Sequence, residues 1–257
     1  MGILNVTPNS FYDGGKHLEE KVILKQVEKM LSEGAAFIDV GGYSSKPNAE
    51  EVSEEQELQR ILPVVQNIIK EFPNTVISID TFRSKVAQAA VENGAAIIND
   101  ISAGSLDANM MKTVAQLQVP YIMMHMKGTP QTMQSLAQYE NIVKEMLFYF
   151  SEKIAQARSF GINDLILDPG FGFAKTVEQN FEVLTKLELF QITELPILAG
   201  LSRKSMIYKT LDTTSEFALN GTTSLNTISL LKGAKILRVH DVKEAVECVQ
   251  LFTQLKN

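Results

Sequence analysis

Polar residues able to bind or catalyse follow a series of short apolar runs in this chain. The residues that end or follow these eight runs are Asn5, Asp39, Asp80, Asn99 with Asp100, His125, Asp168, Ser202 and His240. Buried parallel strands read as continuous apolar runs, and an α/β barrel carries its chemistry where those strands end. The pattern therefore predicts that polar side chains converge on one mouth, as in an enzyme.

Two acidic residues, Asp80 and Asp168, close runs that are otherwise apolar. A desolvated carboxylate is costly unless it is paired or hydrogen-bonded. For Asp80 an alternative is capping of a helix that begins near Phe82. For Asp168 capping is harder to argue, because Pro169 holds it extended and a Gly-rich stretch follows. With the amide of Asn99, the two carboxylates would suit a flat heterocycle that presents several N–H donors.

Basic residues follow the last two runs. Arg203 and Lys204 lie where a helix starts, and cations there oppose the helix dipole at a cost of ~0.3–1 kcal/mol each. We therefore expect an anion or an electron-rich ligand beside them, with a solvated basic turn as the alternative. Arg238 and His240 are two residues apart and would share one face, as a seat for phosphate or diphosphate. His125 is a weaker candidate for the pocket wall.

Two polar segments, 5–15 and 41–49, contain Gly and Pro and follow the first and second runs. Such residues interrupt regular structure, so both segments are expected to be loops at the mouth. Each alone could be a solvated connection. Two of them on the same face look like a pair of mobile lids.

The apolar runs recur about every 33 residues, which is roughly what a repeated strand–helix unit needs. Between the runs lie stretches with a helical pattern and charged outer faces: 19–33, 54–71, 82–93, 140–160, 177–190, 216–232 and 242–255. Gly34, Gly94 and Gly161 follow three of them, where a helix end favours positive φ. We predict one (β/α)8 TIM barrel domain over residues 1–257. A doubly wound open sheet is the alternative.

Composition excludes several other classes of protein. The net charge of -6 argues against a nucleic-acid partner, whose binding face should be basic. No apolar run approaches membrane-spanning length and no signal peptide is recognised, so we expect no membrane partner. The single Cys248 excludes an internal disulfide and fits a reducing compartment. We expect a cytoplasmic protein.

Taken together, these segments resemble the dihydropteroate synthase family, which has the TIM-barrel fold and binds pterins. The resemblance is carried by motifs in order along almost the whole chain: Asn5-Val6-Thr7-Pro8, Ser10-Phe11, Asp13-Gly14-Gly15, Asp39, Gly41-Gly42, Ser44, Ile79-Asp80-Thr81, Ile98-Asn99-Asp100, Met123-Met124-His125-Met126, Asp168-Pro169-Gly170-Phe171-Gly172-Phe173, Ser202-Arg203-Lys204-Ser205 and Arg238-Val239-His240. Each motif alone is a weak signal, but the occurrence of all of them in this order makes the resemblance strong.

The resemblance implies condensation of 6-hydroxymethyl-7,8-dihydropterin diphosphate with para-aminobenzoate, in a homodimeric enzyme that uses Mg²⁺. It implies that the pterin is held by Asp80, Asn99, Asp168 and Lys204. It implies that the diphosphate is held by Arg238 and His240, with Asn5 reaching the Mg²⁺. The aminobenzoate would be framed by Ser45, Pro47, Phe173, Lys204 and Ser205. Asp13, from the first loop, would stabilise a pterin cation, so that Asp13, Lys204, Asp80, Arg238 and His240 carry the catalysis.

The chain departs from the commonest family pattern in both loops. Asn9 stands where Asp is usual, and Lys46 replaces an Arg, which loses a bidentate hydrogen-bonding fork. Other functions therefore stay open at this point. They are a pterin-binding methyltransferase domain with a corrinoid partner, a pterin-binding paralogue that does not catalyse, and Schiff-base chemistry at Lys204.

Overall fold

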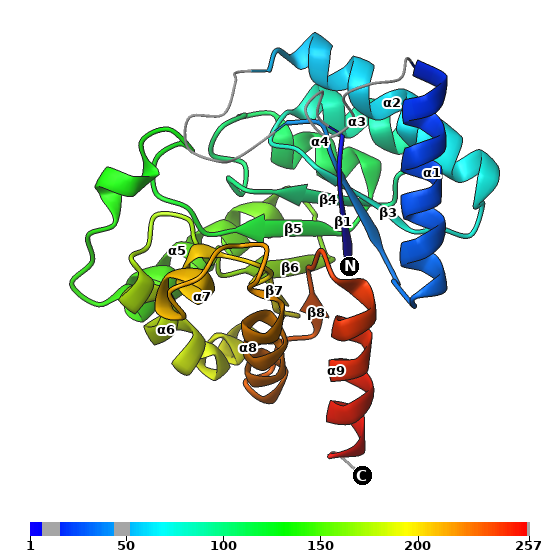
Figure 1. Ribbon diagram of the computed structural model, residues 1–257. Helices are drawn as coiled ribbons and strands as arrows, with labels where there is room; N and C mark the ends of the chain where they lie inside the picture. Colours follow the sequence, from blue (N-terminus) through cyan, green and yellow to red (C-terminus); the bar gives the residue numbers. More distant parts are fainter. Residues whose placement is uncertain (7–15, 44–51, 256–257) are drawn as a thin grey trace.

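The computed structural model describes residues 1–6, 16–43 and 52–255 (Figure 1). Six strands pair in parallel and in chain order, each with the next. They are β1 (Gly2–Asn5), β2 (Ile38–Gly41), β3 (Ile77–Asp80), β4 (Ile97–Asp100), β5 (Tyr121–Met124) and β6 (Leu165–Asp168). Two shorter strands, β7 (Leu198–Ala199) and β8 (Ile236–Leu237), pair in parallel with each other. All eight predicted apolar runs therefore contain a strand.

Single parallel bridges join the two groups of strands into one ring. Leu167 at the end of β6 pairs with Ile197 beside β7, and Gly2 in β1 pairs with Val239 beyond β8. The backbone N–H of Leu167 donates to the carbonyl of Pro196 over 2.9 Å, and that of Ile3 donates to Val239 over 2.9 Å. A closed ring of eight parallel strands is a TIM barrel. The barrel prediction is confirmed, and the open-sheet alternative is wrong.

The base of the barrel is filled by an apolar cluster to which every strand, or the residue just before it, contributes. Its members are Met1, Phe37, Val76, Ala96, Ile97, Ile122, Ile166, Leu198 and Ile236. Side chains of alternate residues point to the same side of a strand. Residues two positions further along these strands therefore also face the barrel axis, closer to the C-terminal mouth.

Helices surround the strands, which lie at the centre of Figure 1. They are α1 (Lys16–Ser32), α2 (Glu54–Glu71), α3 (Ser84–Glu92), α4 (Met110–Leu117), α5 (Ile142–Ser159), α6 (Val177–Thr185), α7 (Ser205–Thr210), α8 (Leu219–Leu231) and α9 (Val242–Gln254). Every predicted helical stretch overlaps one of them, and α1 begins three residues before the predicted stretch 19–33. The stretch 177–190 is shorter than predicted, because α6 ends at Thr185 and a 3₁₀ segment, Leu187–Thr193, follows.

Helix α2 shows how the sequence specifies one of these elements. Ser53 accepts a hydrogen bond from the backbone N–H of Gln56, whose side chain accepts one from the backbone of Ser53, so a capping box starts the helix. Ile61, Val65 and Ile68 follow at helical spacing and are fully buried against the barrel.

Among the described residues, no helix is long and apolar enough to cross a membrane.

The glycines expected at helix ends have the positive φ angles that were predicted for them. Gly34, Gly94 and Gly161 have φ of 96°, 108° and 89°. A residue with a Cβ rarely adopts this left-handed conformation, so Gly is favoured at the C′ position. Each glycine lets its helix stop and the chain turn back toward the next strand.

Gly94 and Gly161 provide a matched test of this packing. A Cβ at Gly94 would lie 2.9 Å from Cγ1 of Ile69 in α2, whereas a Cβ at Gly161 would meet nothing within 4 Å. We expect Gly161→Ala to lower the free energy of unfolding by ~1–2 kcal/mol through backbone strain alone. Gly94→Ala should cost about 1–3 kcal/mol more because it overpacks α2. Urea unfolding measures both, and equal losses would contradict the role given to Ile69.

Candidate active site

The inward-facing rows of the barrel carry polar residues from its apolar base toward its mouth. Asn99, Asp168 and Arg238 lie two residues beyond Ile97, Ile166 and Ile236 of the basal cluster. Asp39 lies two residues beyond Phe37 in the same way. Asp39 is fully buried, and Asn99 and Asp168 are nearly so. The sequence expectation that distant segments meet in one cup is therefore confirmed for these residues.

The guanidinium of Arg238 joins two carboxylates in the floor of this cup. Its Nε donates to Oδ2 of Asp39 over 2.6 Å, and Nη2 donates to Oδ2 of Asp80 over 2.7 Å. Asn99 Nδ2 donates to Oδ2 of Asp39 over 3.1 Å, and the hydroxyl of Tyr43 donates to Oδ1 of Asp80 over 3.1 Å. Four strand ends and the start of the second loop are thus connected through one cation.

This arrangement corrects the expectation that Arg238 is a free cation on the rim. The chain continues past β8 so that Arg238 faces the acidic floor, where two carboxylates balance its charge. The capping alternative for Asp80 is wrong. Helix α3 begins at Ser84, whose N–H donates to Oδ2 of Asp107 over 2.7 Å, and Asp80 is used by Arg238 and Tyr43.

Burial dominates the electrostatics of the floor. It raises the pKa of Asp80 to about 7, while the Arg238 cation opposes that rise and Asp39 adds to it. Burial also raises the pKa of Asp168, and the ammonium of Lys204 is the largest opposing influence. For Arg238, burial disfavours the charged form, but Asp39 and Asp80 outweigh it and raise the pKa. The carboxylates and the guanidinium therefore stabilise each other's charged forms.

Lys204 and Asp168 form a second pair on the other side of the cup. Lys204 is the N-cap residue of α7, and its ammonium donates to the carbonyl of Phe171. The same Nζ lies 5.0 Å from the centre of the Phe173 ring, a cation–π contact. Asp168 accepts a hydrogen bond from the N–H of Gly170 over 2.7 Å. Burial lowers the pKa of Lys204 to about 8, and Asp168 opposes that change.

The neighbouring Arg203 does not share this role. Its guanidinium makes two hydrogen bonds of 2.8 Å with the carboxylate of Asp241, and further bonds with the carbonyls of Ser215 and Glu216. The bidentate pair removes the need for a ligand beside Arg203. The expected anion or electron-rich ligand therefore concerns Lys204 alone.

The rim of the cup carries His240 and Asn5. His240 is exposed, and its Nδ1 lies 2.9 Å from Oγ of Ser202, which also accepts the backbone N–H of His240 over 3.1 Å. Burial of part of the ring lowers the pKa of His240 to about 4, and the positive charge of Arg238 adds to this. Asn5 is the exposed last residue of β1. Both residues are exposed at the C-terminal ends of the strands.

The remaining predicted residues lie beside the cup, in the turn after β4 or outside the described residues. Ser205 is the half-buried first residue of α7, next to Lys204. Asp100 is buried and accepts hydrogen bonds from the N–H groups of Ser102 and Gly104 and the hydroxyl of Tyr121, so it shapes the turn after β4. Asp13, Ser45 and Pro47 lie outside the described residues, as do most of the two predicted lid loops.

The sequence reasoning did not assign a role to Asp39, Tyr43, Ser202 or Lys175. For Asp39 a signal was present, because it ends an apolar run as Asp80 and Asp168 do. Ser202 likewise follows the seventh apolar run, whereas Tyr43 and Lys175 have no local signal. Tyr43 and Ser202 act on residues that lie 37 and 38 positions away, and only the fold brings each pair together.

The fold and the site together define a class of protein. The sequence profile of a family described as pterin binding enzyme matches residues 1–240.

Comparison with individual proteins narrows this class. Dihydropteroate synthase of Escherichia coli K12 is 44% identical over 253 residues, covering 98% of this chain and 89% of the relative. Dihydropteroate synthase of Haemophilus influenzae is 43% identical, covering 100% of this chain and 94% of the relative. The Yersinia pestis dihydropteroate synthase, solved in complex with a sulfonamide drug, superposes with a TM-score of 0.93 at 38% identity, covering 99% of this chain and 93% of that one. The chain belongs to the dihydropteroate synthase family.

The shared carboxylate of Asp39 gives a prediction about stability. Asp39→Ala leaves Nε of Arg238 and the amide of Asn99 without an acceptor in a buried place. We expect the free energy of unfolding at neutral pH to fall by about 1–3 kcal/mol for the unsatisfied donors. The control is Glu54→Ala, which breaks a largely exposed pair with Lys85 and should change stability by no more than ~0.5 kcal/mol. Urea unfolding that gives equal values would reject the bridging role of Asp39.

Proposed function

We propose that this chain condenses 6-hydroxymethyl-7,8-dihydropterin diphosphate with para-aminobenzoate and releases diphosphate and 7,8-dihydropteroate. The observation that carries the proposal is the convergence of Asp80, Asn99, Asp168 and Lys204 on one cup. The relatives named above support it, as does a Xanthomonas albilineans dihydropteroate synthase solved with 4-aminobenzoic acid. That structure has a TM-score of 0.92 at 35% identity and covers 99% of this chain and 92% of that one.

In this proposal the pterin binds in the floor of the cup. A carboxylate takes two parallel hydrogen bonds from an amidine-like edge, as it does from Arg. The ring presents such an edge, so Asp168 and Asp80 are its acceptors and Asn99 and Lys204 complete the set. Arg238 donates one N–H to Oδ2 of Asp80 over 2.7 Å, so this carboxylate already accepts a hydrogen bond from a planar donor group.

The diphosphate binds above the pterin, between Asn5, Arg238 and His240. His240 and Asn5 are exposed at the rim, and Arg238, two residues before His240, is paired with Asp39 and Asp80 in the floor. The fold family implies a Mg²⁺ at this place. Asn5 offers an uncharged amide oxygen at an exposed strand end, which fits a cation that keeps most of its waters and binds substrate phosphates. When bound, Mg²⁺ neutralises charge on the departing diphosphate.

The aminobenzoate binds beside the pterin, next to Phe173, Lys204 and Ser205, with Ser45 and Pro47 from the second loop. An apolar cluster at this end of the barrel gives the aromatic ring a surface. Met124, Met126, Ile101, Met133 and Ala174 form it, and the ring of Phe173 packs against it. The ammonium of Lys204 lies over Phe173 and would face the pterin and the aryl amine together.

The reaction follows from charge. The bond between the pterin methylene carbon and the diphosphate oxygen breaks, and the electron pair leaves with the diphosphate. Arg238 and His240 bind that leaving group, which is the role expected where charge develops. Asp13 and the floor carboxylates stabilise the positive charge left on the pterin. The amine nitrogen then attacks the methylene carbon and loses a proton. No cysteine nucleophile is involved, since Cys248 is buried in α9 beside Thr223 and Thr227.

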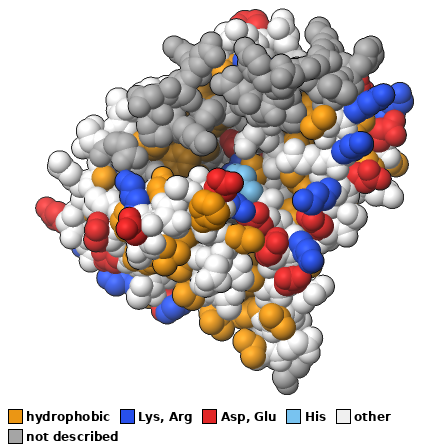
Figure 2. All heavy atoms as spheres, viewed as in Figure 1, with side chains coloured by type: hydrophobic (Ala, Val, Ile, Leu, Met, Phe, Trp, Pro, Cys, Tyr) orange, Lys and Arg blue, Asp and Glu red, His pale blue; other side chains and the backbone are white. Residues whose placement is uncertain are grey.

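We also propose that two copies of the chain associate through α8 and α9. Four large apolar side chains there are more than half exposed: Phe217, Leu231, Leu251 and Leu255. Figure 2 shows hydrophobic side chains gathered at the end of the molecule where Figure 1 places these helices. A contiguous apolar patch of this kind is typical of a protein–protein interface.

The decisive experiment is release of diphosphate on mixing both substrates with the protein. The wild-type chain should release diphosphate over many turnovers only when para-aminobenzoate is present to trap the pterin cation. Asp80→Ala and Lys204→Ala should each lower kcat/KM at least about 100-fold, because each removes a charged group from the pterin site. Lys85→Ala, at an exposed pair outside the barrel, is the control. A wild-type chain that releases no diphosphate would reject the function, and near-normal turnover in either variant would reject the site.

Pterin affinity should depend on pH on both sides of neutrality. The raised pKa of Asp80, about 7, means that its carboxylate charge is lost as pH falls through that value. The lowered pKa of Lys204, about 8, means that its positive charge is lost as pH rises through that value. Binding should be tightest between these values and weaken by about tenfold per pH unit outside them. Calorimetry with the pterin alone measures this. Asp80→Asn should flatten the acidic limb, and an unchanged limb would contradict the assignment.

A further inference from the structure

A buried lysine that the proposed mechanism does not use packs against the turn that follows β6, residues 170–174, here called the active-site turn. The side chain of Lys175 is almost fully buried. Its Nζ contacts the carbonyl oxygen of Gly170 at 3.0 Å, the carbonyl oxygen of Phe173 at 3.0 Å and Nδ1 of His125 at 3.1 Å. A lysine ammonium has three N–H donors and no acceptor. Each of its donors therefore has one partner in this place.

Two of those partners belong to the turn that carries the site. Gly170, Gly172 and Ala174 all have positive φ, at 69°, 82° and 47°. A Cβ on Gly170 would lie 2.3 Å from the carbonyl oxygen of His125, so the turn is pressed against the end of β5. A backbone of this shape persists only where its surroundings hold it. Lys175 supplies that hold by binding the first and last carbonyls of the turn.

The opposite side of the turn meets Lys204. The carbonyl of Phe171 accepts a hydrogen bond from the Lys204 ammonium, and the Phe173 ring lies beneath it. The side chain of Lys204 also runs past Gly172, whose missing Cβ would be 3.3 Å from its Cδ. The position of the turn therefore sets the position of Lys204 and Phe173, the two described groups nearest the proposed aryl amine.

His125 fixes Lys175 from the end of β5. Burial lowers the pKa of His125 to about 2, and the charges of Lys175 and Lys127 add to this, so the imidazole is neutral. Its Nδ1 can then accept a hydrogen bond from Lys175. The ring is held edge-on by Tyr149, with 4.9 Å between ring centres, and its backbone N–H donates to the carbonyl of Asp168 over 2.9 Å.

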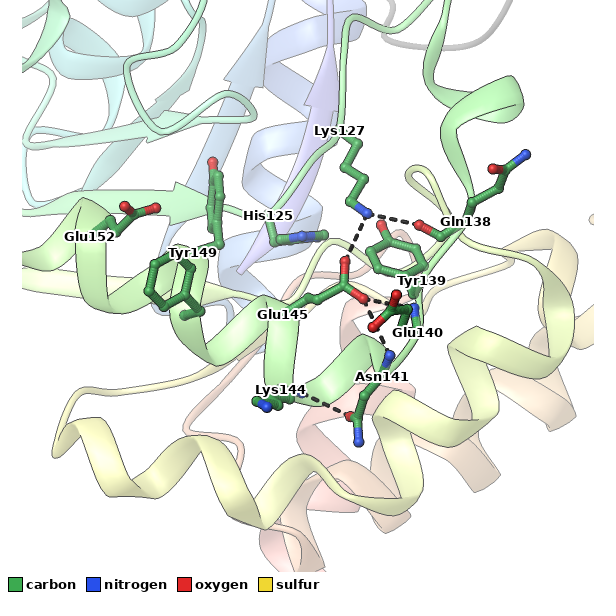
Figure 3. A pocket seen from close by; sticks show the side chains of 11 residues that line it. His125, Lys127, Gln138, Tyr139, Glu140, Asn141, Lys144, Glu145, Tyr149 and Glu152 are labelled. Carbon is green, nitrogen blue, oxygen red and sulfur yellow. Dashed lines mark hydrogen bonds and ion pairs between the residues drawn. The ribbon is translucent and has the colours of Figure 1, made fainter.

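A pocket of about 990 Å³ lies on the outer side of His125, between β5 and the start of α5 (Figure 3). None of the residues assigned to the pterin lines it. Lys127 reaches across it to Glu145 over 3.0 Å and to the carbonyl of Gln138 over 2.8 Å, and covers the Tyr139 ring. The ammonium of Lys127 bonds Glu145 and Gln138, whereas that of Lys175 bonds the turn directly. Lys127 meets the turn only through the ring of Tyr139, whose hydroxyl donates to the carbonyl of Ala174 over 2.9 Å.

We propose that Lys175, held by His125, is a positioning residue for the aryl-amine side of the site. This proposal rests on the condensation proposed above. It assigns to Lys175 no contact with substrate. Lys175 acts through the carbonyls of Gly170 and Phe173, which place the Phe173 ring and the ammonium of Lys204. Its effect falls mainly on the aryl-amine side, because Asp80 and Asn99 keep their own partners Arg238, Tyr43 and Asp39. Asp168 and Lys204 contact the turn, so they pass only part of the change on to the pterin.

The test is Lys175→Met, which gives an unbranched side chain one heavy atom shorter and removes the three donors. We expect the KM for para-aminobenzoate to rise at least about tenfold, while the calorimetric Kd for the pterin changes less than about threefold. The matched control, Lys127→Met, removes a lysine from the pocket side of His125 and should leave both constants within about twofold. A lysine that serves only folding would lower Tm without this separation of the two constants.

A second variant decides the case if Lys175→Met does not fold. His125→Leu removes one acceptor of Lys175, and we expect a smaller rise in the same KM, about threefold, again without a matching change in pterin Kd. Unchanged KM values, or equal changes in both constants, would overturn the proposal. Diphosphate release by the wild-type chain and by Lys127→Met tests the proposed function separately, so the failure of either idea can be recognised.

Discussion

The sharing of one guanidinium by two carboxylates is the interaction on which the mouth of this barrel depends. Asp39 and Asp80 come from adjacent strands and would repel each other in a place with little water. Arg238, from the far end of the chain, binds both, at 2.6 and 2.7 Å. Removing one partner of such a buried pair leaves a charge without compensation, which costs far more than the pair contributes. The first and last thirds of the chain are thereby held to one geometry.

The closed ring makes this sharing possible. Residues 39 and 238 meet because β8 returns to β1, and the seam is completed by the pair Gly2 and Val239. In an open sheet the first and last strands would be separated by the width of the sheet. The alternation of side chains then decides which residues enter the cup: Asn99 points inward to Asp39, whereas its neighbour Asp100 is taken up by the turn that follows. The set of polar residues in the cup therefore depends both on the closure of the barrel and on the alternation of side chains along each strand.

Much of this could be predicted from the sequence. Buried strands that end in polar residues are a local pattern, and it located all eight strands and the residues Asp80, Asn99, Asp168 and Lys204. Glycines at helix ends were also local signals and were correct. Helix α4 was missed because Met110–Leu117 is short and its N-cap residue, Asn109, makes no side-chain cap hydrogen bond. The partners of Arg238 and Arg203 could not be predicted. Asp39 meets Arg238 only when the ring closes, and Asp241 meets Arg203 only when β7 and β8 pair. Both arginines had been interpreted from their charge alone.

The two shortest strands have a further consequence for how the barrel opens. β7 and β8 each contain two residues, and single bridges join them to β6 and β1. Lys204, Arg238 and His240 follow these strands. Segments with few backbone hydrogen bonds are where a native protein opens locally at the lowest cost in free energy. Amide hydrogens of this quarter of the wall should exchange with solvent sooner than those of β2 to β5. Loss of ligand binding on warming would then precede loss of the fold.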